Sequence, residues 1–477
     1  MLLRHSGVYL AARGVPAIIN FFAIAFFTRW LDPDAYGVYA LAMATVSLGA
    51  ALGFQWLSLG VARFLPRHEP HPEALLATIL RAFVVGVLVA ATAALGARVF
   101  ASSLPPKIVW LTLGVLIAHA WFELSLELVR VRMQPMRYGM MSTVRSVVAF
   151  AVGALLVWLG QGAAAPLFGV LTALVLASVA FMPKDWGRAL RTPQDAEILR
   201  KLLRYGAPLT FTFALNFIIV ASDRFMLSAF MGSEAVGLFA PGYDLTLQSL
   251  GVLMSIVNLA AYPLAVRAFE QRGPQAAAEQ MEKNLTLLLV VALPAAAGMA
   301  VCAGNIADVV FGSAYSASAA MLIPWIALGI IISGIKAFYA DIAFQLAEKT
   351  RDSMLVNLVA AVVNVGLNLW TIPAFGLLGA AYSLVAAYTV GLLLSVAWGR
   401  RLFPLRMGRR DHFKILIACT AMAGLVWTCR DGRGIDWLAI QVTVGSVGYG
   451  VILVLLDAGG SRRRLLGAFR AWNRGVA

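Results

Sequence analysis

Long apolar segments alternate with short polar connections along the whole of this 477-residue chain. A helix crosses a bilayer core of about 30 Å with about 20 apolar residues. The pattern therefore predicts an all-α polytopic membrane protein with about fourteen transmembrane helices. They are expected at residues 7–30, 38–62, 75–97, 108–129, 140–160, 163–182, 206–230, 239–264, 284–307, 320–346, 354–373, 377–398, 413–429 and 437–456.

Residues 202–240 repeat the beginning of the chain at an offset of 200 positions, without a gap. The residues that recur are Leu2, Leu3, Arg4, Ile18, Ile19, Ala35, Gly37 and Ala40. A duplicated membrane unit is the simplest explanation of such self-similarity. Because six helices return the chain to the side on which it began, the two copies are expected to be parallel, related by a pseudo-two-fold axis along the membrane normal.

The repeat and the polar connections together predict a domain organisation. A six-helix lobe (1–182) is followed by a cytoplasmic linker (183–205), and a second six-helix lobe (206–398) by a basic cytoplasmic linker (399–412). Two extra transmembrane helices (413–457) have no counterpart in the repeat, and a basic cytoplasmic tail (458–477) follows them. The path of a transported substrate is expected between the two lobes.

The composition supports a membrane protein and sets its orientation. The chain is 61% hydrophobic and only 13% charged, which leaves too little polar surface for a soluble protein of this length. Its net charge of +15 comes from basic residues that gather in alternate short loops, which stay in the cytoplasm. The only basic residues in the opposite loops are Arg29, Arg98, Lys107, Arg430 and Arg433. Both termini are therefore expected in the cytoplasm, with membrane lipids rather than nucleic acid as partners.

Little in the sequence points to catalysis or to a cofactor. Cys302, Cys419 and Cys429 stand singly, without the spacing of a disulfide framework or a metal site. The outer connections are short turns, which leave no soluble domain large enough for a catalytic fold. A transporter without a metal or another cofactor is expected, and not an enzyme.

Four segments carry a resemblance to a known family. They are Thr28-Arg29-Trp30-Leu31 followed by residues 36–40 (YGVYA), Ser222-Asp223-Arg224 followed by Gly237-Leu238-Phe239, Val310-Phe311-Gly312 followed by Tyr315, and residues 357–383 (NLVAAVVNVGLNLWTIPAFGLLGAAYS). On these segments the chain resembles the Wzx-type flippases of lipid-linked oligosaccharides, the polysaccharide transporter branch of the multidrug/oligosaccharidyl-lipid/polysaccharide superfamily. The likeness covers nearly the whole chain.

The resemblance implies two parallel, MATE-like six-helix lobes around a central cavity, with two additional C-terminal helices. It implies transport of an undecaprenyl-diphosphate-linked glycan from the inner to the outer leaflet of the bacterial cytoplasmic membrane, by alternating access through a cationic cavity between the lobes. Such transport serves the synthesis of O-antigen, exopolysaccharide or capsule. A polysaccharide polymerase and a chain-length regulator are the protein partners that it suggests.

A diphosphate that crosses apolar surroundings needs positive charges close to it, because an unpaired charge costs several kcal/mol or more there. The basic residues inside the predicted spans are Arg13, Arg81, Arg224 and Lys336. We expect Arg13, Arg224 and Lys336 to contact substrate, together with the acidic neighbours Asp223 and Asp341. The alternatives are snorkelling to headgroups for Arg13, contact with headgroups or another helix for Arg224, and a structural pair for Lys336. Asp341, five positions after Lys336, lies too far round an ideal helix for an i,i+4 pair. Arg81 lies near the cytoplasm and is expected to snorkel.

The fourth predicted span carries a stripe of ionisable residues. His119, Glu123 and Glu127 follow i,i+4 spacing, which places them on one helix face. His119 and Glu123 are candidates for coupling to a proton or sodium gradient, whereas Glu127 is expected to pair with Arg81 or Arg130.

Other functions remain open at this point. A lipid II flippase has nearly the same physical requirements. A cation-coupled multidrug antiporter of the same superfamily would share the twelve-helix core, but a cavity for cationic drugs favours carboxylates over the basic residues found here. A membrane enzyme such as a glycan polymerase or acyltransferase would need a large outer loop.

Overall fold

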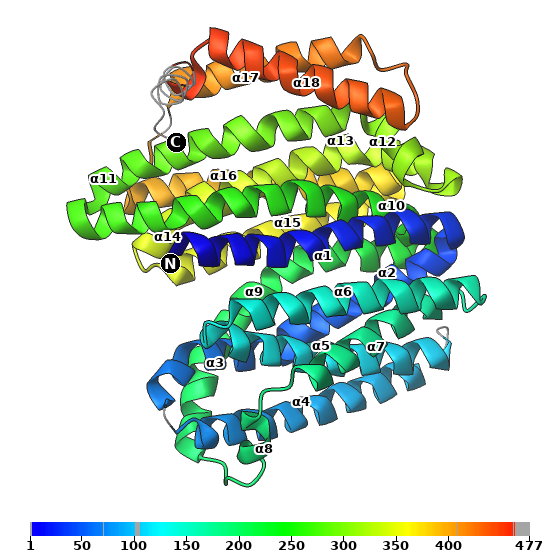
Figure 1. The fold of residues 1–477 in the computed structure, drawn as a ribbon, viewed down its shortest axis with the longest axis vertical. Helices are drawn as coiled ribbons and strands as arrows, with labels where there is room; N and C mark the ends of the chain where they lie inside the picture. Colours follow the sequence, from blue (N-terminus) through cyan, green and yellow to red (C-terminus); the bar gives the residue numbers. More distant parts are fainter. Residues whose placement is uncertain (1, 70, 101–104, 407, 461, 463–477) are drawn as a thin grey trace. The chain divides into compact units, whose positions relative to one another are not determined.

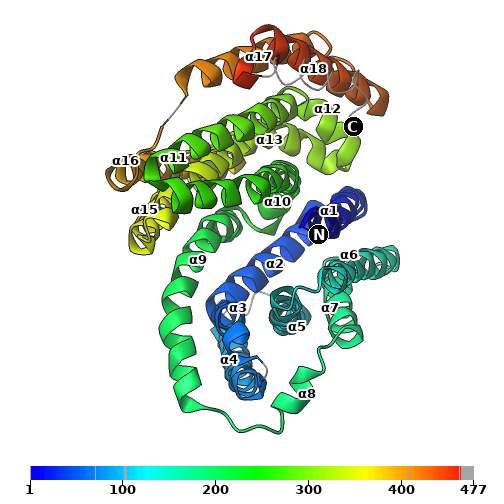
Figure 2. The same cartoon turned by 60° about the vertical axis from the view of Figure 1, so that its left-hand side comes forward.

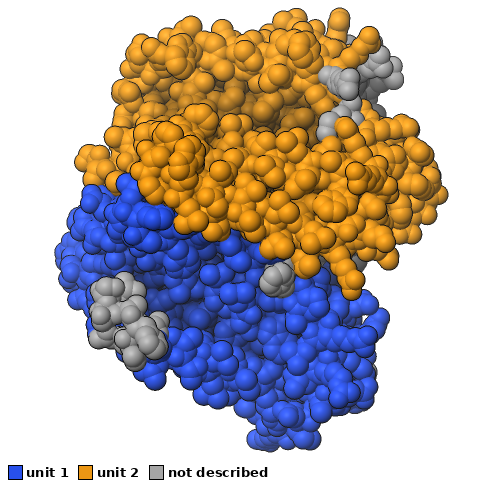
Figure 3. Space-filling model, turned by 180° about the vertical axis from the view of Figure 1, so that it is seen from behind, with its two compact units in different colours: residues 1–237 blue, residues 238–477 orange. Residues whose placement is uncertain are grey.

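The computed structural model describes residues 2–69, 71–100, 105–406, 408–460 and 462. The chain forms two compact units, Met1–Gly237 and Leu238–Ala477, which Figure 3 shows in blue and orange. All regular elements formed by the described residues are helical. The predicted all-helical polytopic fold is confirmed.

Helices α1–α9 make up most of the first unit (Figure 1). They are α1 (Leu2–Trp30), α2 (Pro33–Gly53), α3 (Gln55–His68), α4 (Glu73–Phe100), α5 (Pro106–Val131), α6 (Pro135–Trp158), α7 (Ala164–Ala180), α8 (Asp185–Ala189) and α9 (Ala196–Met231). Helix α6 packs against both α1 and α7, and the long α9 packs against α2 and α3 (Figure 2). The predicted linker 183–205 contains α8 and the beginning of α9.

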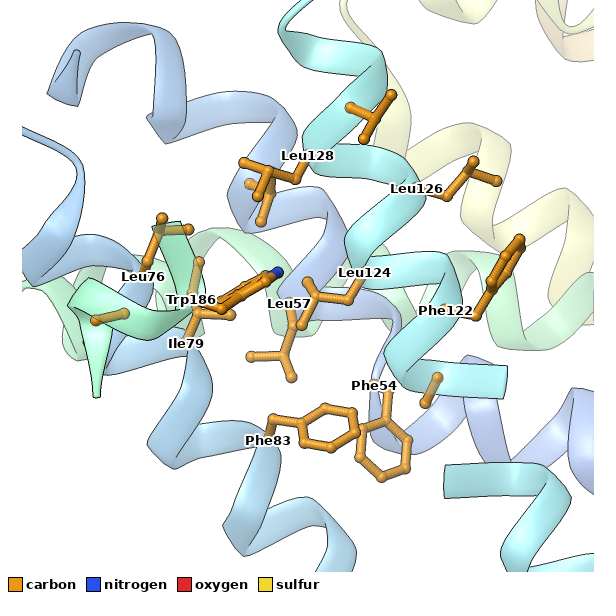
Figure 4. Packing of buried hydrophobic residues seen from close by; sticks show 14 of the residues in the cluster. Phe54, Leu57, Leu76, Ile79, Phe83, Phe122, Leu124, Leu126, Leu128 and Trp186 are labelled. Atoms are coloured by element: carbon orange, nitrogen blue, oxygen red, sulfur yellow. The ribbon is translucent and has the colours of Figure 1, made fainter. Parts of the chain in front are cut away.

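One predicted span in this unit is divided in two. The segment 38–62 breaks at Phe54, whose φ of −128° and ψ of −17° leave the helical region between α2 and α3. Its ring packs against Phe83 of α4 at a centroid distance of 5.1 Å (Figure 4). An apolar run shows no sign of such a break, because the residue that interrupts the helix is itself a core residue.

The core of the first unit extends into the predicted linker 183–205. Leu57, Leu124 and Leu128 are fully buried in it, and Trp186 of α8 inserts beside them with 2% of its surface exposed (Figure 4). The indole of Trp186 lies 5.0 Å from the ring of Trp121. Helix α8 is thereby fixed to the unit by apolar burial, which favours packing roughly in proportion to the area removed from solvent.

The second unit continues from α10 (Ser233–Thr246), whose first turns belong to the first unit. Its other helices are η1 (Leu247–Gly251), α11 (Val252–Val301), α12 (Ala303–Val310), α13 (Ser313–Ile335), η2 (Lys336–Ala340), α14 (Ile342–Leu346), α15 (Thr350–Phe375), α16 (Leu377–Leu402), α17 (Arg409–Trp427), α18 (Ile435–Leu455) and η3 (Ala458–Gly460). Helix α13 packs against α16, α15 against α16, and α17 against both α11 and α18.

Helix α11 contains two predicted spans and the connection between them. At Gly273 the backbone takes φ 80° and ψ −176°, so α11 consists of two helices joined at a kink. Glycine suits this position because the conformation has a positive φ. The polar connection expected at 265–283 is therefore helical on both sides of Gly273.

Each of the fourteen predicted segments is helical over most of its length. Among the described residues, nine helical segments are long and apolar enough to cross a membrane, one of them the 69-residue run Ser233–Val301. Two shorter apolar helices, Gly14–Trp30 and Ala164–Ala180, add to these. The chain is thus an integral multi-pass membrane protein.

The two copies of the repeat meet at Gly37 and Gly237. A Cβ atom on Gly37 would lie 1.8 Å from the carbonyl oxygen of Ser233, and one on Gly237 would lie 1.7 Å from that of Pro33. The two contacts exchange equivalent positions of the two copies, which is the reciprocity produced by a local two-fold axis. The recurrence of glycine at these positions has a steric reason, because a side chain fits at neither.

Candidate functional site

Lys336 lies at the start of the π-turn η2, and this turn brings it together with Asp341. In an α-helix, residues five apart are separated by about 140° around the axis. Here the amide of Asp341 donates to the carbonyl of Lys336 at 2.8 Å, the i+5 bond of a π-turn. Lys336 Nζ then donates to Asp341 Oδ2 at 2.6 Å. The expectation that the two lie too far round the helix to pair is wrong, because it assumed α-helical geometry.

Two further polar side chains complete this buried cluster. Lys336 Nζ also donates to Asn357 Oδ1 at 2.7 Å, and Ser395 Oγ donates to Asp341 Oδ1 at 2.6 Å. The side chains of Lys336 and Asp341 are only 8% and 13% exposed. The cluster joins η2 to α15 and α16 and leaves each charged group with an opposite charge and a neutral hydrogen-bond partner. The sequence did not identify Asn357 or Ser395 as site residues, although Asn357 begins one of the four family segments, because a single Asn or Ser in an apolar helix has no distinctive spacing.

Asp223 and Arg224 are both buried in α9, with 0% and 7% of their surfaces exposed. Arg224 Nη1 donates to the backbone carbonyl of Ala40 in α2 at 3.4 Å. Ala40 belongs to the segment of α2 that follows the close contact at Gly37. Arg224 therefore combines a buried positive charge with a bond to a neighbouring helix of the same unit. Arg13 is in α1, but its side chain lies outside the described part of the chain.

The ionisable stripe of α5 separates into distinct contacts. Glu123 pairs with Arg145 of α6 at 3.3 Å, and the Arg145 guanidinium lies 5.2 Å from the centre of the Phe122 ring. Glu127 pairs with Arg130 at 2.6 Å, as expected. His119 is partly buried, whereas the Glu123 side chain is 44% exposed. Ion coupling by His119 and Glu123 stays a prediction. The described residues contain no cluster of three His, Cys, Asp or Glu side chains suited to a metal.

Arg81 is engaged in a contact with the linker. Its Nη2 donates to the carbonyl of Thr192 at 2.8 Å, ahead of α9. Nearby, Arg132 binds Asp185 of α8 through two bonds of 2.5 and 3.1 Å, and its Nε donates to Glu69 at 3.1 Å. The Arg132 guanidinium beside it holds the pKa of Asp185 below its usual value. These basic residues attach the linker to the other helices of the first unit, a role that their positions in the sequence do not reveal.

Charged side chains buried inside apolar helices mark functional sites of membrane proteins, such as substrate and ion pathways, and this all-helical, multi-pass fold buries Arg224 and Lys336 in this way. Residues 26–320 match the family model described as polysaccharide biosynthesis protein. The match covers more than half of the chain, and the chain belongs to this family. It is a transporter of the flippase type rather than an enzyme, and the resemblance stated from the sequence is confirmed.

Two relatives carry names related to glycan transport. A protein of Shigella flexneri named as an O-antigen transporter is 20% identical over 401 residues, which are 80% of this chain and 94% of that protein. A protein of Haloferax volcanii named as the low-salt glycan biosynthesis flippase Agl15 is 19% identical over 450 residues, 93% of each chain.

Solved structures share the fold. The lipid II flippase MurJ in an inward closed conformation superposes with a TM-score of 0.80 at 13% identity, over 96% of this chain and 99% of that one. An inward-facing multidrug resistance transporter of the MATE family superposes with a TM-score of 0.57 at 16% identity, over 83% of this chain and 92% of that one.

Proposed function

We propose that this protein is a flippase that moves an undecaprenyl-diphosphate-linked oligosaccharide from the inner to the outer leaflet of the bacterial cytoplasmic membrane, by alternating access. The observation that carries the proposal is the burial of Arg224 and Lys336 inside apolar helices of a polysaccharide biosynthesis family member. The names of the Shigella and Haloferax relatives support a lipid-linked glycan as the substrate.

Buried cations suit a substrate whose diphosphate has to leave water. Arginine can bind phosphate oxygens through two parallel hydrogen bonds, and lysine binds them as a point charge. In the proposed cycle, Arg224 contacts the diphosphate in the outer half of its helix. Lys336 contributes a positive charge that Asp341 neutralises when substrate is absent. The pair thus keeps a cation inside the membrane at a lower cost than an unpaired one.

The test is export of surface glycan from cells that lack the chromosomal copy and carry a plasmid-encoded variant. We expect Arg224→Ala and Lys336→Ala to lower surface glycan at least tenfold at equal amounts of protein in the membrane. Arg224→Lys is expected to retain part of the activity. Arg433→Ala is the matched control, because Arg433 is a 59% exposed arginine that pairs with Asp308 at 2.7 Å. Wild-type export from both buried-cation variants would contradict the proposal.

A lipid II flippase is the second candidate, favoured by a Rhizobium meliloti relative named as the lipid II flippase MurJ. That relative is 26% identical over 265 residues, 53% of this chain and 47% of the other. Expression in cells depleted of their own lipid II flippase separates the two functions. The oligosaccharide flippase proposed here is not expected to restore growth.

Collapsing the proton and sodium gradients one at a time in the export assay identifies the ion that drives transport.

A further inference from the structure

Both π-turns of the described chain border one pocket in the second unit. The pocket has a volume of about 380 Å³ and is lined by residues of η1, η2 and the neighbouring helices. Turns of this kind occur frequently at functional sites, because they shift side chains out of the regular helical register. The volume lies within the range of about 300–1,000 Å³ typical of small-molecule sites.

The lining combines aromatic rings with uncharged polar groups. Tyr243, Phe338 and Tyr388 contribute rings, Ser255 and Ser333 contribute hydroxyls, and Gln248 of η1 contributes an amide. No charged side chain of the described residues lines the pocket. Gln248 and Phe338 both fall within predicted transmembrane spans, where an uncharged polar pocket suits a ligand that is polar and also uncharged.

Gln248 indicates what that ligand must supply. Its Oε1 is buried and accepts no hydrogen bond from any described residue. A buried acceptor without a donor is costly, and such groups are rare in native proteins. Gln248 lines the pocket, and its terminal amide torsion has broad minima, so a rotation of the amide would turn this oxygen toward a ligand hydroxyl, whereas a hydrocarbon chain in the pocket would leave it without a partner.

We propose that this pocket binds a sugar ring of the glycan that the protein carries; the assignment rests on the proposed flippase function and specifies where the substrate's sugar is recognised. A pyranose presents an apolar C–H face, which packs on aromatic rings, and hydroxyls at its edge, which exchange hydrogen bonds with amide and hydroxyl groups. The diphosphate requires cations and does not fit a lining without charge. The pocket therefore selects the sugar and not the lipid diphosphate.

The π-turn η2 connects this pocket to the buried charge cluster. Lys336 begins the turn and binds Asp341 and Asn357, while Phe338, two residues later, lines the pocket. The conformation of one short turn thus sets the position of a cation and of an aromatic wall at the same time. A substrate whose diphosphate and sugar are adjacent requires these two features close together.

The experiment measures binding of two probes to the full-length protein in lipid nanodiscs. One probe is undecaprenyl diphosphate, and the other is the lipid-linked oligosaccharide extracted from cells lacking the transporter. Wild type is expected to prefer the oligosaccharide probe. Gln248→Leu is expected to reduce that preference about tenfold, because it loses one buried hydrogen bond to the sugar. The affinity of this variant for undecaprenyl diphosphate is expected to stay unchanged. Phe338→Leu is expected to reduce the preference in the same direction.

Gln271→Leu is the matched control, because Gln271 lies on an exposed part of α11, away from the pocket. The preference of this variant for the oligosaccharide probe is expected to equal that of wild type. An unchanged preference in Gln248→Leu would overturn the pocket assignment while leaving the flippase function intact. Tighter binding of both probes by Gln248→Leu would also overturn it, since the occupant would then be the isoprenoid chain. Failure of wild type to bind either probe would instead refute the proposed function, and the pocket assignment with it.

Discussion

The pairing of Lys336 with Asp341 depends on a single extra residue in a helical turn. Loss of one partner from a buried ion pair leaves an uncompensated charge, at a cost of about 3–5 kcal/mol, whereas apolar replacement of both is often neutral. We therefore expect Lys336→Met and Asp341→Leu each to lower the thermal unfolding temperature of the detergent-purified protein, and the double variant to recover it.

Export separates the structural role of this pair from its role in transport. A stable double variant is expected to remain defective in surface glycan, because it has lost the cation proposed to accompany the diphosphate. Full export from the double variant would show that Lys336 and Asp341 serve the fold alone. Single variants as stable as wild type would show that the pair contributes little to folding.

The close backbone contact at Gly37 predicts that a side chain at this position destabilises the protein. A methyl group at this position would lie 1.8 Å from the Ser233 carbonyl oxygen, so the backbone of α2 or α10 would have to move. Gly37→Ala is expected to destabilise the protein by about 1–3 kcal/mol, the usual cost of overpacking. Gly53→Ala in the same helix is the control, since a Cβ there meets no atom within 4 Å. Equal unfolding temperatures for the two variants would contradict the close contact between the repeat copies.

Among the elements, α8 shows how a short helix in a linker becomes part of a compact unit. Trp186 fixes it through apolar burial, and Asp185 fixes it through Arg132. Because the pKa of Asp185 is lowered in the folded protein, its stabilisation is fully present above the unfolded-state value of about 3.9 and is lost as the pH falls through the folded value.

The Asp185–Arg132 pair should therefore contribute fully at neutral pH and disappear in acid. Asp185→Asn is expected to unfold at a lower temperature than wild type at pH 7, and the difference should shrink below about pH 4. Thermal unfolding followed between pH 7 and pH 3 measures this difference. Asp431→Asn provides the control, because the Asp431 side chain is 94% exposed and exposed pairs contribute little. A difference that stays constant with pH would show that the carboxylate charge is not what attaches α8.

At the scale of the whole molecule, the apolar pattern was sufficient to predict the helical, multi-pass fold, because segment length alone distinguishes a membrane span. It could not predict the break at Phe54 or the π-turn at Lys336, since both depend on neighbours distant in sequence. Lys336 and Asp341 were selected as site residues from their charge in an apolar span. Their contact and the partners Asn357 and Ser395 required the three-dimensional structure.

The orientation of the whole chain remains a prediction of its charge distribution, and the native cysteines offer a direct measurement. Cys302 and Cys419 are buried, whereas Cys429 is partly exposed at the end of the thirteenth predicted span, on the side with few basic residues. We expect a membrane-impermeant maleimide to label spheroplasts expressing the wild-type protein and to leave Cys429→Ser unlabelled. Cys302→Ser should label like wild type. Labelling of Cys429 only after the membrane is permeabilised would place both termini outside the cell. The helix ends assigned here to the inner leaflet would then lie at the outer leaflet, and the outer position proposed for Arg224 would be wrong.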